Sequence, residues 1–162
     1  ASGGAISFHQ IDRTSYLSSS TVDSWVQILD PITMTPDSAS SRMALDFNSL
    51  AGVSSTSASI MIKFTRTIGS TVTDLIGTMA NRNAAGTQCL WGGGEEMYTN
   101  AYTGHAISIH YTDLPNTTSA VTYKAYVLSA AGGTSFTLGS VHATGSNNEY
   151  PAVDTRFTLT EL

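Results

Sequence analysis

The sequence predicts an all-β protein, an antiparallel β-sandwich or jelly roll, and two observations support that prediction. First, apolar and polar residues alternate with a period of two in several short segments, as they do in strands that bury one face. Second, segments rich in Gly, Ser, Pro, Asn and Asp separate these runs, and no window has the apolar stripe, the cap and the glycine stop of a helix. At 162 residues the chain is long enough for one domain with its own core.

The clearest alternation occurs in residues 105–112 and 121–128. Asp113 and Pro115 lie between these runs and favour a turn, because Pro cannot donate to a strand ladder and Asp bonds its own backbone. We therefore expect the two runs to form one long antiparallel pair. Their apolar sides are formed by Ile107, Ile109, Tyr111, Val121, Tyr123, Ala125 and Val127.

Shorter or weaker runs predict the remaining strands. We expect them at residues 22–35 with a break at Pro31, and at 42–48, 58–65, 71–79, 136–138 and 156–162. The side chains that should face the core are Met43, Leu45, Phe47, Ala58, Ile60, Ile62, Phe64, Phe157 and Leu159.

The first 21 residues are rich in Gly and Ser, so we expect residues 1–21 to form an N-terminal arm and residues 22–162 to form the jelly-roll domain. The arm either lies over the domain, where it can pair with an edge strand, or tethers a neighbouring subunit; the sequence leaves both open. Ala1 fits either removal of an initiator Met or an artificial ASGG leader.

The composition excludes several classes of partner. Charged residues make up 12% of the chain, the formal net charge is −5, and the seven Lys and Arg residues are scattered. Without a basic cluster we expect no nucleic-acid binding, and without a long apolar run we expect no membrane insertion. Cys89 is the single cysteine, so no internal disulfide can form. A hydroxyl-rich surface with so little charge favours self-association.

No motif in the chain indicates catalysis. The sequence lacks the patterns of serine hydrolases, zinc proteases, phosphate-binding loops and dinucleotide-binding loops. His105 and His110 are five residues apart, which places them on opposite faces of one strand. Glu95 and Glu96 are adjacent in a Gly-rich segment, where we expect solvated loop charges. We therefore predict a protein that is not an enzyme, with no catalytic residue, no metal and no cofactor.

Residues 81–103 contain the best candidates for a binding site. This long segment concentrates Trp91, Tyr98 and Tyr102 around a run of glycines. Loops of such length in compact domains are uncommon unless they are functional or disordered. The three aromatic side chains either stack on sugar rings or cover one end of the sandwich and contact a neighbouring subunit, where Tyr and Trp are enriched. We favour the second interpretation.

The C-terminal third resembles virion surface proteins of tailed phages. The resemblance rests on the following landmarks: Asp113, Pro115, Thr117 to Ser119, Val121 to Lys124, Gly132 to Thr134, and Phe157 to Leu162. Proteins of this family carry a jelly roll similar to the heads of C1q and tumour necrosis factor, and they trimerise about a three-fold axis.

The resemblance implies a homotrimeric structural protein on the surface of a phage particle, assembled in the host cytoplasm. Such a trimer decorates the capsid or forms a short spike or fibre head, and its partners are further copies of itself and other virion proteins. The alternative is a receptor-binding fibre head, in which the region of Trp91, Tyr98 and Tyr102 grips a host-surface glycan.

Overall fold

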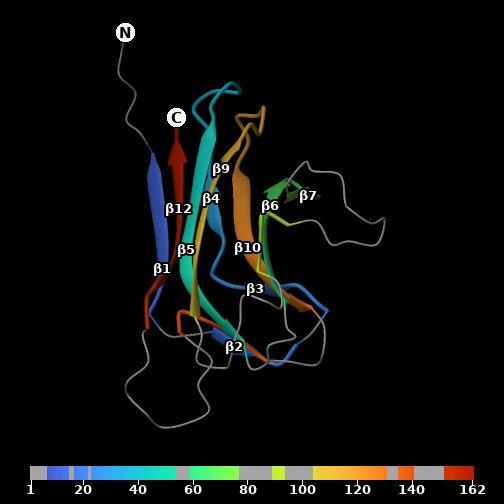
Figure 1. Cartoon of the computed structure of the whole chain (residues 1–162). Coiled ribbons are helices and arrows are strands. Elements are labelled where there is room, and N and C mark those ends of the chain that lie inside the picture. The colour runs from blue at the N-terminus through green and yellow to red at the C-terminus, as the bar shows by residue number, and fades with distance from the viewer. Residues whose placement is uncertain are drawn as a thin grey trace.

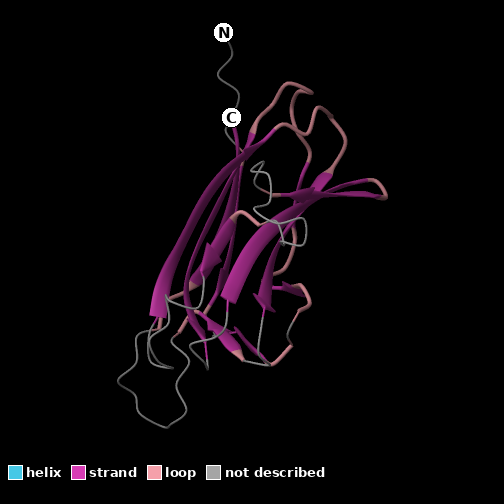
Figure 2. Ribbon diagram, turned by 45° about the vertical axis from the view of Figure 1, so that its right-hand side comes forward, coloured by secondary structure: helices cyan, strands magenta, loops and turns pink. Residues whose placement is uncertain are grey.

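The fold is described by a computed structural model that covers residues 7–14, 17–21, 23–53, 59–76, 89–93, 104–130, 135–140 and 152–162. All regular structure in these ranges is β-strand, which confirms the all-β prediction (Figure 2). The strands in chain order are β1 (Phe8–Arg13), β2 (Leu17–Ser19), β3 (Val26–Gln27), β4 (Ile32–Met34), β5 (Met43–Val53), β6 (Ser59–Ile68), β7 (Thr71–Leu75), β8 (Trp91–Gly93), β9 (Gly104–Asp113), β10 (Val121–Ala130), β11 (Phe136–Leu138) and β12 (Thr155–Glu161).

The strands form two antiparallel sheets that face each other (Figure 1). In sheet 1 the order across the sheet is β1, β12, β5 and β9, and the short strands β2 and β11 extend it at one end. In sheet 2, β10 and β6 pair along their whole lengths; β3 and β4 lie beside β10, and β7 and β8 lie beside β6.

This strand order is that of a jelly roll. When β1 with β2, β3 with β4, β7 with β8, and β11 with β12 are each taken as one position, the described strands fill eight positions along the chain. Sheet 1 then contains the first, eighth, third and sixth positions, and sheet 2 contains the second, seventh, fourth and fifth. Consecutive positions cross repeatedly between the sheets, as in the double Greek key of a jelly roll.

The core lies between the sheets and consists of the alternate side chains of each strand that point inward. Phe47 of β5, Phe64 of β6 and Phe157 of β12 are fully buried. The ring of Phe64 lies 6.3 Å from that of Phe47 and 5.1 Å from that of Phe157, within the range of favourable aromatic pairs. The predicted inward residues of β5, β6 and β12 are all buried, which confirms their faces; Ala58 lies outside the described residues.

The expected pairing of residues 105–112 with residues 121–128 is wrong. Both segments are strands, but β9 pairs with β5 in sheet 1 and β10 pairs with β6 in sheet 2. The chain from Leu114 to Ala120 therefore crosses from one sheet to the other. Pro115 is buried in this connection, and Asn116 adopts the left-handed region with a φ of 54°.

Part of the predicted N-terminal arm lies in sheet 1. Strand β1 pairs with β12 over Phe8 to Arg13, and β2 pairs with β11. Pairing with the domain is one of the two arrangements that the sequence left open. The division of the chain into an arm and a domain at residue 21 stays a prediction.

Candidate functional site

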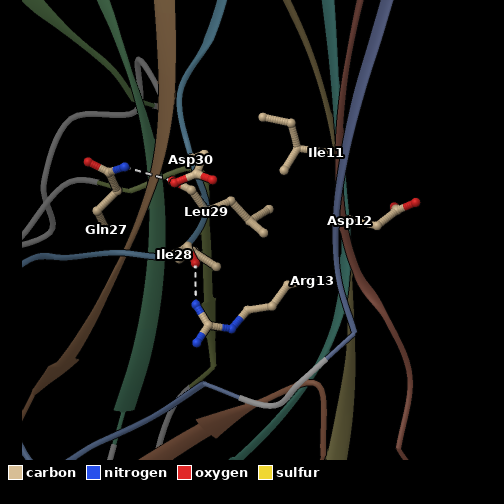
Figure 3. A pocket seen from close by; sticks show the side chains of 7 residues that line it. All are labelled: Ile11, Asp12, Arg13, Gln27, Ile28, Leu29 and Asp30. Atoms are coloured by element: carbon tan, nitrogen blue, oxygen red, sulfur yellow. Dashed lines mark hydrogen bonds between the residues drawn. The ribbon is translucent and has the colours of Figure 1, made fainter.

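A pocket of about 240 Å³ lies beside β1, where the margins of the two sheets part (Figure 3). One wall is β1, the outer strand of sheet 1, and the other is the segment that links β3 to β4 in sheet 2. The lining residues are Ile11, Asp12, Arg13, Gln27, Ile28, Leu29 and Asp30.

The alternation of β1 decides which of its side chains enter the pocket. Ile11 and Arg13 point from β1 toward the opposite wall, whereas Asp12 points away (Figure 3). Arg13 Nη1 donates to the carbonyl oxygen of Ile28 at 3.3 Å and so spans the gap between the sheets. Ile28 and Leu29 are buried and form an apolar floor. The pocket therefore combines an apolar base with a polar wall.

At this pocket, side chains form hydrogen bonds to backbone carbonyl groups at the edge of sheet 2. Gln27 Nε2 donates to the carbonyl oxygen of Leu29 at 2.7 Å, and Arg13 occupies the carbonyl of Ile28. The next residues, Asp30 and Pro31, separate two very short strands, and Pro31 has no N–H to offer. Between β3 and β4, two carbonyl groups are thus occupied and one N–H is absent, and natural sheets use such interruptions to prevent unwanted pairing.

An ion pair fixes the outer face of β1. Arg156 Nε of β12 donates to Asp12 Oδ1 at 2.8 Å, and Gln10 Nε2 donates to Asp12 Oδ2 at 2.7 Å. The hydrogen bond from Arg156, followed by that from Gln10, holds the pKa of the Asp12 carboxyl below its ordinary value. The same contact raises the pKa of Arg156. Asp12 therefore carries a negative charge on an exposed outer strand at neutral pH.

A second polar cluster joins the two sheets inside the sandwich. Arg66 of β6 donates through Nη1 to Asp113 of β9 at 2.8 and 3.1 Å, and the hydroxyl of Tyr123 in β10 donates to Asp113 Oδ2 at 2.8 Å. Tyr123 is fully buried, and burial, followed by the hydrogen bond to Asp113, raises the pKa of its phenol. These contacts link side chains of both sheets at the start of the β9–β10 crossing, so we assign the cluster a structural role.

Of the predicted binding residues, the structure describes Trp91 alone; Tyr98 and Tyr102 lie outside the described residues. Trp91 lies in β8 opposite Ile62, and its side chain is half-buried against the core. Whether these three aromatic residues act together stays a prediction.

Sequence reasoning did not find an aromatic cluster on the outer face of sheet 2. Lys63 Nζ lies 4.7 Å from the ring centroid of Trp25 and 6.0 Å from that of Tyr126, and it forms an ion pair with Asp74 at 2.8 Å. Alternation places Lys63 and Tyr126 on outer faces, but it gives no sign that the ring of Trp25 lies beside Lys63. The pocket was missed because its walls come from separate segments, one of them within the predicted arm.

The histidines of β9 diverge as their spacing predicts. His110 lies on the outer face, where its Nδ1 is 2.6 Å from Asp46 Oδ1 of β5. His105 lies opposite Ala51, on the inner side. Within the described ranges there is no group of three or more His, Cys, Asp or Glu side chains that could hold a metal ion. The same part of the chain contains no helix long and apolar enough to cross a membrane.

Comparison with known proteins gives a likeness in structure only. No family model and no curated protein matches the sequence. Among solved structures, the chain is similar to a chain in the structure of the Gx strain of infectious bursal disease virus, with 13% sequence identity and a TM-score of 0.41. The alignment covers 96% of this chain and 37% of that chain, so the protein spans little more than a third of its neighbour's length.

Proposed function

We propose that this protein is a non-enzymatic structural component of a virus particle, exposed at the particle surface and associated with copies of itself. The observation that carries the proposal is the strand order of the two sheets, an eight-position jelly roll, which is the architecture that many viral capsid domains use. The charged side chains support the structural part of the proposal. Each of the ion pairs Lys63–Asp74, Arg66–Asp113 and Asp12–Arg156 joins two different strands.

The finer proposal is a homotrimer on a tailed phage, where it decorates the capsid or forms a short spike or fibre head. It draws on the resemblance in the C-terminal third and on a surface with only 12% charged residues. In this proposal residues 1–21 contact other virion proteins, the protein assembles in the host cytoplasm, and it has no cofactor and no contact with nucleic acid or membrane.

Purified virions test the proposal. Quantitative mass spectrometry should find the chain at many copies per particle, and a map of the particle should place it on the outer surface. Light scattering should give a solution mass of three times 17.0 kDa. Absence of the chain from particles, or turnover of a defined substrate by the pure protein, would contradict the structural role; a mass other than three chains would contradict the trimer alone.

A second candidate is a glycan-binding head. Jelly rolls also occur in lectins, and Trp91 keeps part of its surface accessible at the sheet margin. A glycan array separates the two functions. Glycan binding that is lost in Trp91→Ala and retained in Trp25→Ala would favour the glycan-binding head. Trp25 is a matched control, because both tryptophans are half-buried but lie on different faces of sheet 2. The absence of binding to any glycan would favour the purely structural role.

A further inference from the structure

We propose that copies of this chain join edge to edge: strand β1 of one copy pairs antiparallel with strand β9 of a second copy, and Tyr111 of that β9 enters the pocket beside β1. The proposal deepens the proposed function, since it rests on self-association and names the surfaces that associate.

The two outer strands of sheet 1 are β1 and β9. Among the described strands, none pairs with the outer side of β1 or with that of β9, which are six and ten residues long. The edges of sheet 2 are made of shorter pieces, namely β3 and β4 on one side and β7 and β8 on the other. Long edges present rows of unpaired N–H and C=O groups, which are templates for another strand.

The strand directions permit a head-to-tail contact. Successive neighbours from β1 through β12 and β5 to β9 are antiparallel, so β1 and β9 of one copy run in opposite directions. A second copy related by rotation about an axis along the strands therefore brings its β9 antiparallel to β1. Such a contact uses two different surfaces, and it closes into a ring when the rotation closes.

One register matches the outer faces. If Phe8 lies opposite Leu114 of the second copy, Gln10 lies opposite Thr112 and Asp12 lies opposite His110. Phe8 and Leu114 are 58% and 52% exposed, so this register covers two of the most exposed large apolar side chains of the described residues. It also brings Asp12, which is paired with Arg156, beside His110, which contacts Asp46.

The same register fills the pocket. On the inner face, Ile11 comes to lie opposite Tyr111 of the second copy. Tyr111 is half-buried on the inner side of β9, at the margin of its own core. Its ring would meet the apolar floor formed by Ile28 and Leu29, and its hydroxyl would meet the exposed carboxylate of Asp30 at the rim. A Tyr that is buried on one side and bonded at its hydroxyl is typical of protein interfaces.

Cross-linking tests the register. In a Cys89→Ser background, the double variant Gln10→Cys, Thr112→Cys places its two thiols on opposite edges of sheet 1. Three strand spacings separate them within one chain, about 14 Å, which exceeds disulfide reach. A disulfide must therefore join two copies, and non-reducing electrophoresis should show covalent multimers. The matched control, Thr158→Cys, Thr112→Cys, moves one thiol to the neighbouring strand β12 and should stay a single chain.

Light scattering provides the second test. Phe8→Asp should lower the mass to that of a single 17.0 kDa chain at concentrations where Val72→Asp, which changes an exposed apolar residue of β7, stays multimeric. The apparent dissociation constant should rise at least tenfold for Phe8→Asp. The proposal is overturned by a monomeric wild-type protein, by an unchanged mass for Phe8→Asp, or by equal cross-linking of both double variants. Virions that contain the chain without this cross-link would retain the proposed function and reject the edge contact.

Discussion

Removal of Asp113 should destabilise the fold more than removal of any surface carboxylate. The Asp113 side chain is 6% exposed and accepts hydrogen bonds from Arg66 and Tyr123. Asp113→Ala leaves a fully buried phenol hydroxyl without its acceptor, and it leaves the largely buried guanidinium of Arg66 with only the carbonyl oxygen of Leu114 at 3.3 Å. Breaking a buried ion pair from one side costs roughly 3 to 5 kcal/mol, and we expect about 3 kcal/mol because the Arg66 side chain keeps 19% of its exposure.

Urea unfolding followed by tryptophan fluorescence measures this loss. With a dependence of about 2 kcal/mol per molar urea, the midpoint should fall by about 1.5 M. Asp113→Asn should fall between the wild type and Asp113→Ala, since its amide oxygen still accepts from Tyr123. The matched control is Asp74→Ala, which breaks the exposed pair with Lys63 and should cost less than about 1 kcal/mol.

The result that would refute this reasoning is a midpoint for Asp113→Ala within the range of the Asp74→Ala control. It would mean that water reaches Arg66 freely and that the two sheets do not depend on the cluster. A changed slope with an unchanged midpoint would point instead to a different degree of unfolding.

Three further predictions concern single sites. Phe64→Asp places an unpaired charge in the aromatic core and should abolish the near-ultraviolet dichroism of the folded domain; a soluble, folded variant would contradict the inward face of β6. Arg156→Ala should raise the pKa of Asp12 toward its ordinary value of 3.8 in an NMR titration, and the stability that this pair adds in the wild type should be lost as the pH falls through the lowered pKa. Cys89 should react with a thiol reagent at pH 8 more slowly in the folded protein than in urea, because burial raises its pKa; equal rates would contradict that burial.

Alternation predicted the faces of strands well but not their neighbours. The apolar positions of β5, β6 and β12 are buried as expected, because a period of two fixes which side chains share a face. The same period is silent about which strand lies alongside. For that reason β9 and β10, which follow each other in the chain, were expected to pair, whereas each lies beside a strand from the first half of the chain.

Asp113 shows why turn-forming residues led to the wrong expectation that β9 pairs with β10. An Asp just before Leu-Pro is typical of a turn, and Asp113 does precede one. Its side chain nevertheless points between the sheets to meet Arg66, a residue 47 positions earlier. An inward charge within an alternating run is a signal of a buried partner, since an unpaired charge would not be buried. Which residue is the partner depends on how the chain crosses between the two sheets, and a single sequence does not show that crossing.

The edges of the two sheets differ, and this difference connects the fold to the proposed self-association. Sheet 2 is interrupted at Pro31, and side chains of Gln27 and Arg13 occupy the carbonyls beside that break. Such features prevent pairing with other chains. The described part of sheet 1 has no comparable break along β9, and an exposed Phe8 begins β1. A protein that only needed to stay monomeric would gain from protecting the edges of both sheets, so the contrast favours an assembly whose contacts run along the edges of sheet 1 and not along the β3–β4 edge of sheet 2.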